Sequence, residues 1–362
     1  GDLDGLAWDL GDPDGLRVNN PNDFLPASIP LIGTPRFHPM KGPMTTQTLR
    51  GIADSGPMHW RGDRTGQNPV GGESMEAAAF KEFNGAFVGL VGRDAELTAP
   101  ELQSFTDFAL QIIPPPNPVR NLDDSLTATQ LLGDDIYFNQ TTTGLGGCND
   151  CHLIDPAQKL FGTSKQSTFE GAGISQLFKI PHLRNMYQKV GMFGTAMNNP
   201  NETYGGGPQI KGFGYLADGS IDTLINFFTD TFNFQGNPTQ QAQHRREVSE
   251  FSLVADSNLK PIVGQQVTLT STNLADVSSR ITLLINRALA GDCDLVAWSS
   301  TAANGVVSGR LLSNGNFKLS PSAGNIEITQ GQIQTQVANN NEPVTYTCVP
   351  PGNGLRISKT QP

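Results

Sequence analysis

The sequence predicts a mainly α, loop-rich chain that ends in a small α+β domain. Apolar residues recur at helical spacing in several segments between residues 74 and 253, whereas alternation of apolar and polar residues is confined to the stretch beyond 257. Glycine and proline together make up 65 residues (40 plus 25) of 362, which is typical of folded domains with long loops. We therefore expect three domains, at 1–118, 119–256 and 257–362.

The first predicted domain begins with a long loop region. Residues 1–70 are rich in Gly, Pro and Asp and show little periodicity. A helix is then expected over 74–91 and a second over 98–113. The prolines at 114–116 end the second helix, because proline cannot donate a backbone hydrogen bond inside a helix, and they mark the boundary near 118.

The second predicted domain is helical as well. Its expected helices cover 127–138, 218–228 and 239–253. Within 174–190, Pro181 interrupts the pattern, so we expect a short extended piece followed by a helix.

The third predicted domain alternates between strands and one helix. The helix is expected over 274–290, and Asn314-Gly315 is a favourable hairpin turn. The expected strands are 266–272, 294–299, 306–312 and 317–320.

Charge and hydropathy exclude two classes of partner. Acidic residues outnumber basic ones by 34 to 24, a net charge of −10, and no basic block occurs, so nucleic-acid binding is not expected. No apolar run approaches the roughly 20 residues that cross a bilayer, so we expect a soluble protein without a membrane span. Residues 1–20 lack the basic start and apolar core of a targeting peptide, and a start at Gly1 suggests processing or truncation.

The motif CNDCH at residues 148–152 is the most specific chemical signal. A structural zinc site would need four ligands, yet no second close cysteine pair exists. A thioredoxin-type pair would follow a strand, whereas this pair follows a Gly-rich loop. In C-x-x-C-H, the two thiols form thioethers with haem and the histidine supplies the proximal iron ligand. We therefore predict haem c attached at Cys148 and Cys151, with His152 as iron ligand.

The other two cysteines, Cys293 and Cys348, lie in β-rich segments of the last domain. Haem c attachment implies assembly outside the reducing cytosol, where disulfides persist. We predict a Cys293–Cys348 disulfide that staples the α+β domain, with two buried free thiols as the alternative. The predicted location is periplasmic or extracellular, in a bacterium.

A six-coordinate haem needs a distal ligand, and Met or His is usual. Met192 lies in a Gly-flanked loop 40 residues after His152, and it is the predicted ligand. Met186 and Met197 are interpreted as packing residues. A bis-His haem through His182 is the alternative.

Further characteristic segments occur along residues 1–250: GDLDGLAWDLGDP at 1–13, FHPMKGP at 37–43, PMHWRGDR at 57–64, FKIPHLRNM at 178–186 and ADGSIDTL at 217–224. Together with CNDCH, they resemble the di-haem c-type cytochromes related to bacterial cytochrome c peroxidase and MauG. The resemblance implies mainly α, loop-rich haem domains of the cytochrome c type. In relatives the segment similar to 1–13 follows the first C-x-x-C-H, so that motif is expected upstream of Gly1 or on another polypeptide.

The resemblance also implies site residues for a second haem. His38 and His59 compete as its ligand or distal acid–base group, and Trp60 is placed between the two haems. A catalytic Glu is expected beyond Trp60. Glu82 is the candidate and Glu76 a further one, although an acid on a helix usually faces solvent. A calcium ion between the haem domains is implied too.

One departure from the family pattern concerns the distal ligand. Peroxidases ligate the second haem through a Met after the Asp-Gly-Ser-like turn, where this chain offers Thr231 and its neighbours. Met192 must therefore serve instead if the iron is six-coordinate.

Three functions stay open at this point. The first is electron transfer through covalently bound haem, with a redox partner protein as donor or acceptor. The second is a di-haem peroxidase or MauG-like oxidising enzyme acting at a haem near His59. The third treats 257–362 as a binding or assembly module of a larger extracytoplasmic redox complex. Electron transfer with peroxidase-like activity is the function we expect.

Overall fold

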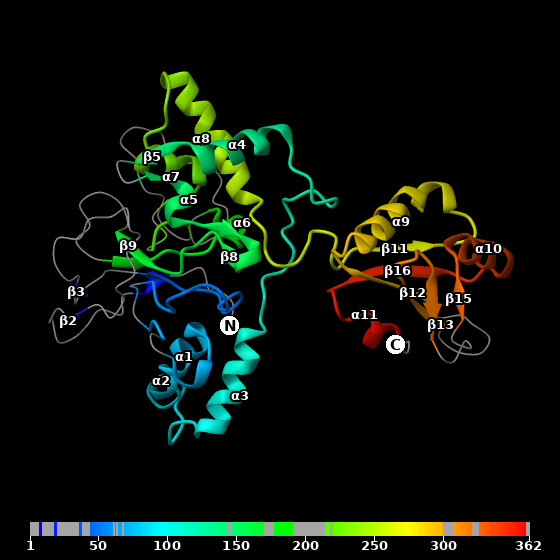
Figure 1. Ribbon diagram of the computed structural model, residues 1–362, viewed down its shortest axis with the longest axis horizontal. Helices are drawn as coiled ribbons and strands as arrows, with labels where there is room; N and C mark the ends of the chain where they lie inside the picture. The colour runs from blue at the N-terminus through cyan, green and yellow to red at the C-terminus, as the bar shows by residue number, and fades with distance from the viewer. Residues whose placement is uncertain are drawn as a thin grey trace. The chain divides into compact units, whose positions relative to one another are not determined.

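The structure is a computed structural model of the chain (Figure 1). It describes residues 44–60, 62, 64–66, 69–143, 146–169, 177–191, 214–217, 219, 221–299, 307–320 and 326–359, together with short strands at 7–8, 18–19 and 36–37. The chain divides into two compact units. The first comprises 1–114 and 126–257, and the second comprises 115–125 and 258–362.

The first helices of unit one follow the predicted pattern with one difference. The segment predicted as one helix over 74–91 forms two, α1 (Met75–Lys81) and α2 (Asn84–Gly89). The Ser74 hydroxyl caps α1 by accepting a hydrogen bond from the N–H of Ala77 at 3.1 Å. Helix α3 (Ala99–Leu110) begins behind Thr98 and has Pro100 in its first turn, where proline is tolerated.

Helices α4 (Ala128–Asn139) and α8 (Pro238–Leu253) pack against each other in unit one. They approach closely at Gly133, where a Cβ atom would lie 2.1 Å from the carbonyl oxygen of Glu247, so only glycine fits this crossing. Both helices contribute to one apolar core, which we call the apolar cluster. Its buried members are Ile136, Tyr137, Leu183, Met186, Tyr215, Leu224, Phe228, Phe234, Val248, Phe251 and Ala255.

The remaining elements of unit one are short. They comprise the helices η1 (Val70–Gly72), α5 (Cys148–Cys151), η2 (Pro156–Gln158), α6 (Met186–Lys189) and α7 (Leu224–Thr231). The strands form two-stranded antiparallel pairs: β1 (Ala7–Trp8) with β4 (Met44–Thr45), β2 (Val18–Asn19) with β3 (Arg36–Phe37), β5 (Thr141–Thr143) with β6 (Gly146–Gly147), β7 (Ile154–Asp155) with β8 (Leu160–Phe161), and β9 (Ser167–Phe169) with β10 (Leu177–Lys179). The side chain of Thr223 caps α7, so this helix begins at Leu224 and not at 218 as the sequence pattern predicts.

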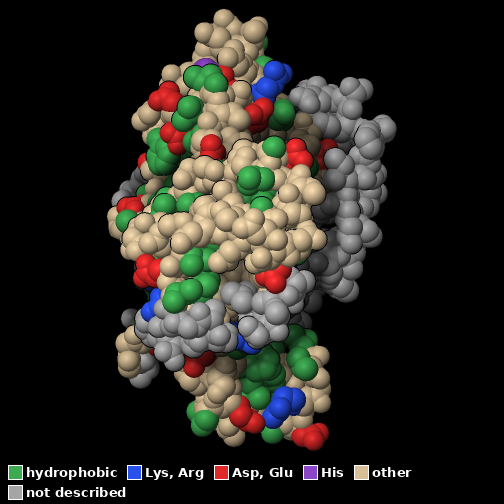
Figure 2. Space-filling model, turned by 90° about the vertical axis from the view of Figure 1, so that its right-hand side faces the viewer, with side chains coloured by type: hydrophobic (Ala, Val, Ile, Leu, Met, Phe, Trp, Pro, Cys, Tyr) green, Lys and Arg blue, Asp and Glu red, His purple; other side chains and the backbone are tan. Residues whose placement is uncertain are grey.

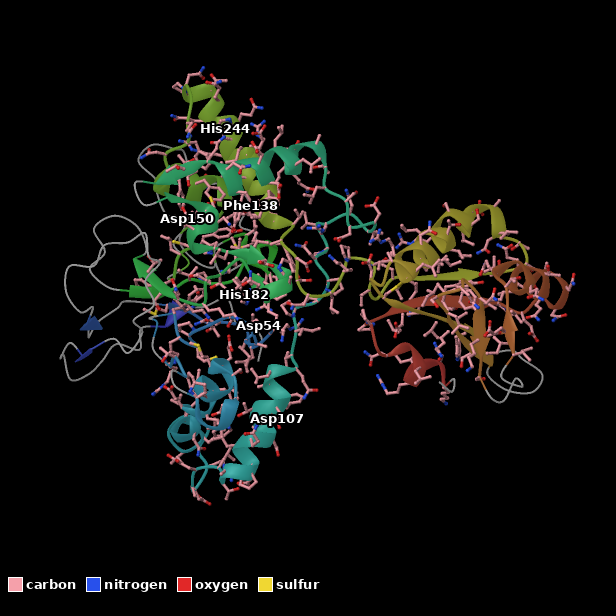
Figure 3. All side chains as sticks on the ribbon, viewed as in Figure 1. Asp54, Asp107, Phe138, Asp150, His182 and His244 are labelled. Carbon is pink, nitrogen blue, oxygen red and sulfur yellow. A yellow bond between two sulfur atoms is a disulfide. The ribbon has the colours of Figure 1, made fainter. Side chains whose placement is uncertain are left out.

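Arg184 joins two distant segments of unit one. Its side chain is 1% exposed, and its Nη2 donates to the carbonyl oxygens of Gly51 at 2.6 Å and Ala53 at 3.0 Å. Figure 3 labels His182 and Asp54, which come from the two segments that Arg184 links. A buried guanidinium with these partners fixes residues 51–54 against the segment that follows β10.

Unit two contains a six-stranded antiparallel sheet in the order β11-β16-β12-β13-β14-β15. The strands are β11 (Gln266–Leu269), β12 (Asp294–Ser299), β13 (Val307–Leu311), β14 (Phe317–Leu319), β15 (Glu327–Ile328) and β16 (Val344–Val349). Asn314-Gly315 turns the chain between β13 and β14 as predicted, with Gly315 at φ 84°.

Helices α9 (Leu274–Leu289), α10 (Gln330–Asn340) and α11 (Gly354–Ser358) complete unit two. Its core is apolar and includes Leu284, Phe317 and Tyr346, each 0% exposed. The predicted disulfide is confirmed. Cys293 and Cys348 are bonded inside this core, with their Cα atoms 5.4 Å apart.

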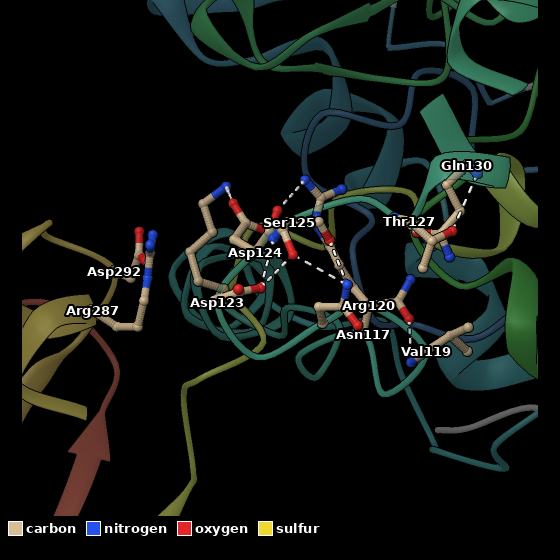
Figure 4. Close-up of polar contacts among 12 residues, drawn as sticks. Asn117, Val119, Arg120, Asp123, Asp124, Ser125, Thr127, Gln130, Arg287 and Asp292 are labelled. Atoms are coloured by element: carbon tan, nitrogen blue, oxygen red, sulfur yellow. Dashed lines mark hydrogen bonds and ion pairs between the residues drawn. The ribbon is translucent and has the colours of Figure 1, made fainter. Parts of the chain in front are cut away.

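Residues 115–125 are held to unit two by polar contacts (Figure 4). The carboxylate of Asp124 binds Arg120 and also accepts a hydrogen bond from Lys260 Nζ at 2.8 Å. Asp123 accepts a hydrogen bond from the N–H of Ser125 at 3.0 Å. Two carboxylates in consecutive positions therefore tie this segment together.

The surface carries mixed charge. On the face drawn in Figure 2, basic side chains are few and stand apart from one another. No helix in the described ranges is long and apolar enough to cross a membrane.

Candidate haem attachment site

The residues between the two motif cysteines shape the helical turn α5. Asp150 Oδ2 accepts a hydrogen bond from the N–H of Gly147 at 2.7 Å, and Asn149 Oδ1 accepts one from the N–H of Ile154 at 3.0 Å. Both ends of the turn are thus fixed by side chains, with Asp150 labelled beside α5 in Figure 3. Because residues three apart in a helical turn share a face, Cys148 and Cys151 present their thiols on one side.

Both motif cysteines are free thiols and are partly buried. Burial raises the pKa of Cys148, and the Sγ atom of this residue lies 3.8 Å from the Thr142 hydroxyl. Burial, followed by the negative charge of Asp150, raises the pKa of Cys151 to about 11. The protein alone therefore keeps this pair as thiols at neutral pH, and it does not activate them as redox nucleophiles.

His152 is oriented by two backbone carbonyls. Its Nδ1 lies 2.8 Å from the carbonyl oxygen of Gly162 and 3.1 Å from that of Pro181. Since both neighbours can only accept, the proton belongs on Nδ1, and the lone pair of the neutral ring is on Nε2. The hydroxyl of Tyr137 donates to the His152 carbonyl oxygen and holds the backbone of this residue as well.

The electrostatics keep His152 neutral. Burial lowers the pKa of His152, and the ammonium of Lys189 lowers it further, against the opposing effect of the Gly162 carbonyl. A neutral imidazole with Nδ1–H bound to a carbonyl is the form that ligates metals, because the second nitrogen then offers its lone pair.

Gly162 is required at its position. It adopts φ +78°, a region that favours glycine, and a Cβ atom there would lie 2.3 Å from Leu183 Cγ. Leu183 packs in the apolar cluster, so moving its side chain aside would disrupt that packing. Glycine at position 162 therefore allows the backbone to place its carbonyl oxygen beside the His152 ring.

The surroundings fit a haem. Cys148 packs against the apolar cluster, which supplies an apolar wall. Ser164, whose N–H donates to the Cys151 carbonyl oxygen at 2.9 Å, has a buried hydroxyl with no hydrogen-bond partner among the described residues. Two thiols on one face, a neutral imidazole and an unsatisfied buried hydroxyl form a donor set that suits a large, partly polar group.

Trp60 is buried at the edge of this region, 8% exposed, and packs with Phe178 and Ala217. Its indole N–H donates to the carbonyl oxygen of Thr45 at 2.7 Å. Two lysine ammonium groups lie near its ring, Lys179 at 6.0 Å and Lys189 at 5.2 Å from the centroid. Trp60 is therefore placed in a cationic environment.

His59 and Glu82 lie apart from the cysteine pair in sequence and contact other groups. The imidazole of His59 meets the Phe83 ring edge-on at 4.8 Å, and its carbonyl closes a turn with the N–H of Gly62. Glu82 Oε1 accepts a hydrogen bond from the N–H of Gly66 at 3.1 Å, and its other oxygen lies 3.7 Å from Arg64. The contacts of Glu82 are those of a residue that shapes the 64–66 loop.

Glu76 differs from the sequence expectation. An acid on this helix was expected to face solvent, but Glu76 is 5% exposed. Its Oε1 accepts a hydrogen bond from the N–H of Gly56 at 3.3 Å and lies 3.8 Å from Lys165 Nζ. The expectation is wrong because tertiary contacts with residues twenty and more positions away draw the carboxylate inward.

His182 is less suited to ligate iron than His152. Its Nδ1 accepts a hydrogen bond from the N–H of Arg184 at 3.2 Å, which puts the proton of the neutral ring on Nε2. Burial, followed by Arg184, Lys179 and Lys189, lowers the pKa of His182 well below its usual range. Met186 is buried in the apolar cluster. His38 and Met192 lie outside the described residues.

No cluster of three or more His, Cys, Asp or Glu side chains suited to a metal ion occurs in the described part of the chain. The calcium ion and the second haem therefore stay predictions.

Several participants were missed by the sequence reasoning. The carbonyls of Gly162 and Pro181 carry no side-chain signal, and Tyr137 lies in the helix predicted over 127–138, whose apolar pattern assigns no role to a hydroxyl. Lys179, between two buried apolar residues, was a signal that could have been used, since a lysine in such a place needs a partner.

Comparison with known proteins gives one distant likeness. No family model matches the sequence, and no curated protein matches it. A chain from the structure "Kuenenia stuttgartiensis Hydrazine Synthase Pressurized with 20 bar Xenon" is similar with a TM-score of 0.42 and 18% sequence identity, over 70% of this chain and 77% of that one.

Proposed function

We propose that this chain is a c-type cytochrome that transfers electrons through a haem attached to Cys148 and Cys151. The observation that carries the proposal is the arrangement of His152. Its ring is held by two backbone carbonyls at Nδ1, directly beside two free thiols on one helical turn. On this proposal, unit one consists of haem domains of the cytochrome c type.

Each residue of the motif has a distinct role. Cys148 and Cys151 anchor the group, while Asp150 and Asn149 keep the spacing of the thiols. His152 would bind the iron through Nε2, and its burial keeps a proton from competing for that nitrogen. When bound, the haem supplies a one-electron Fe(III)/Fe(II) couple.

The proposal includes a redox partner protein and an extracytoplasmic location. Attachment of haem c and the disulfide of unit two both belong to compartments where thiols are oxidised. Met192 remains the proposed distal ligand.

A peroxidase-like oxidising activity is the second candidate, and Trp60 favours it. The carbonyl oxygen of Trp60 accepts a hydrogen bond from the N–H of Lys179 at 2.7 Å. Lys179 ends β10, and the next residue but one, Pro181, contacts His152. A short path through the buried residues Lys179 and Ile180 and the half-buried Pro181 therefore joins Trp60, beside His59, to the proposed haem site.

The test compares the protein, produced with haem c attachment machinery, with H152A and the matched control H182A. We expect a reversible one-electron titration and a low-spin spectrum in the parent and in H182A, and loss of the low-spin form in H152A. A parent without bound haem would contradict the proposal. Steady turnover of peroxide that H59A abolishes would instead support the second candidate.

A further inference from the structure

We infer that Lys179 forms, with Gln47 and Trp60, a binding site for a carboxylate group of the haem. The inference rests on the proposed function, because the carboxylate belongs to the group attached at Cys148 and Cys151. Lys179 thereby recognises the cofactor and sets its reduction potential. The CNDCH motif itself does not indicate this residue.

The position of Lys179 follows from two backbone contacts. Its N–H donates to the carbonyl oxygen of Trp60 at 2.7 Å, and the N–H of the following residue, Ile180, donates to the carbonyl oxygen of Gln166 at 2.8 Å. Two residues after Lys179, the carbonyl of Pro181 contacts Nδ1 of His152 at 3.1 Å. Lys179 is therefore built into the same rigid segment that orients the proposed iron ligand.

The ammonium of Lys179 is buried and poorly compensated. The residue is 6% exposed. Its Nζ donates to Gln47 Oε1 at 3.3 Å and lies 6.0 Å from the Trp60 ring centroid. No carboxylate lies within ion-pair distance of this Nζ in the portion of the chain that the structure describes. An amide oxygen and an indole face do not offset the cost of burying a full charge.

The charged groups around Lys179 also leave its ammonium poorly compensated. Burial, then repulsion from Lys189 and Arg184, lowers the pKa of Lys179 to about 7, and the attraction of Glu76 is the smallest of these effects. Added negative charge beside Lys179 would reverse this imbalance. The site thus selects an anion.

Lys165, in the same unit, is a lysine whose charge is compensated by carboxylates. Its Nζ lies 3.3 Å from Asp54 and 3.8 Å from Glu76, so these two carboxylates already have a cation. Lys165 is consequently a matched control, since its loss removes the same charge from a pair that needs no external anion.

The chemistry of the anion follows from its setting. A haem carries two carboxylates on flexible arms, and Lys179 precedes by two residues the Pro181 carbonyl that contacts the proposed iron ligand His152. A planar carboxylate can accept a hydrogen bond from Nζ while leaving Lys179 in contact with Gln47. A free anion from solution has the same chemistry but would bind independently of haem.

The experiment measures the midpoint potential of the haem-loaded protein and of its K179Q and K165Q variants. Loss of a cation beside the haem stabilises the ferric state, so K179Q should lower the equilibrium constant for reduction by about tenfold, which is about 59 mV for a one-electron couple. K165Q should change the equilibrium constant for reduction far less. Equal potentials in K179Q and the parent, at equal haem content, would overturn the inference.

A second measurement separates the two sources of carboxylate. Acetate is titrated into the haem-loaded parent while the potential is followed. A bound haem carboxylate predicts no change, whereas a saturable change that K179Q abolishes would show a solution-anion site and overturn the inference. A protein that carries no haem at all would contradict the proposed function itself, so the two failures are distinguishable.

Discussion

In unit two, Cys293 and Cys348 are joined by a disulfide inside a continuous apolar core, whereas Cys148 and Cys151 of unit one stay as thiols on a short helical turn. The core of unit two is closed by its own sheet and helices. Unit one instead contains a hydroxyl at Ser164, next to Cys151, without a partner among the described residues, and a buried ammonium at Lys179, two residues before the Pro181 that contacts His152. The difference is that the pair in unit two cross-links a core, whereas the pair in unit one stays free and, on our proposal, holds a haem.

Replacing the thiols should have the largest effect. The double variant C148S/C151S leaves His152 and the hydrogen bonds of Asp150 and Asn149 in place, so the turn should persist without an attachment point. We expect complete loss of covalently bound haem, measured by haem staining after denaturation. The double variant C293S/C348S should retain it, and loss of haem in both variants would break the comparison.

Removing the disulfide should destabilise unit two. The bond closes a loop between residues 55 positions apart. On the chain-entropy model its loss costs about 4 kcal/mol of unfolding free energy, and we expect this loss in denaturant titrations followed by near-UV circular dichroism. An unchanged denaturation midpoint in C293S/C348S would show that the core of unit two needs no covalent support.

The buried ammonium should make the stability of the haem-free protein depend on pH. The pKa of Lys179 is about 7 in the folded state and near its usual 10.5 in the unfolded state, so the unfolded state binds more protons between these values. The contribution of Lys179 to the unfolding free energy therefore rises with pH between these two pKa values. Below pH 7 the full cost of burying its charged ammonium is present. The expected gain is a few kcal/mol.

The measurement is the difference in unfolding free energy between the parent and K179M across pH 6 to 10. This difference isolates Lys179 from the other titrating groups, including its neighbours Lys189, Arg184 and Glu76. Parallel curves for the two proteins would show that the ammonium is not buried as described.

The smallest effect concerns the helix that precedes the motif. Thr127 caps α4 by accepting a hydrogen bond from the N–H of Gln130, and the Gln130 side chain accepts one in return at 2.9 Å. T127A should cost about 1 kcal/mol, and T127S should restore most of it. Thermal unfolding of both variants checks this, and equal losses in T127A and T127S would exclude the cap as the cause.

Local signals explain which parts of the fold could be predicted. The Asn314-Gly315 turn is coded by adjacent residues and occurs as expected, and the helix predicted over 127–138 is found as α4, which Thr127 caps. Helix α10 was missed because its sequence is mostly polar, with only Ile333 and Val337 buried. The helix expected over 74–91 ends early, and the chain turns before α2 begins at Asn84.

The candidate site could likewise be predicted only where its residues are adjacent in the sequence. CNDCH is contiguous, so its chemistry could be predicted from the sequence alone. The carbonyls that orient His152 belong to Gly162 and Pro181, whose roles depend on backbone geometry. The burial of Lys179 depends on Trp60, more than a hundred residues earlier in the chain. Contacts of this kind arise only when the chain has folded.

The most direct test of the central claim is peptide mass spectrometry on the denatured, proteolysed protein from a host that attaches haem c. The account predicts that the peptide with residues 148–152 carries the mass and the visible absorption of one haem that survives denaturation. A colourless peptide with two alkylatable thiols would contradict it.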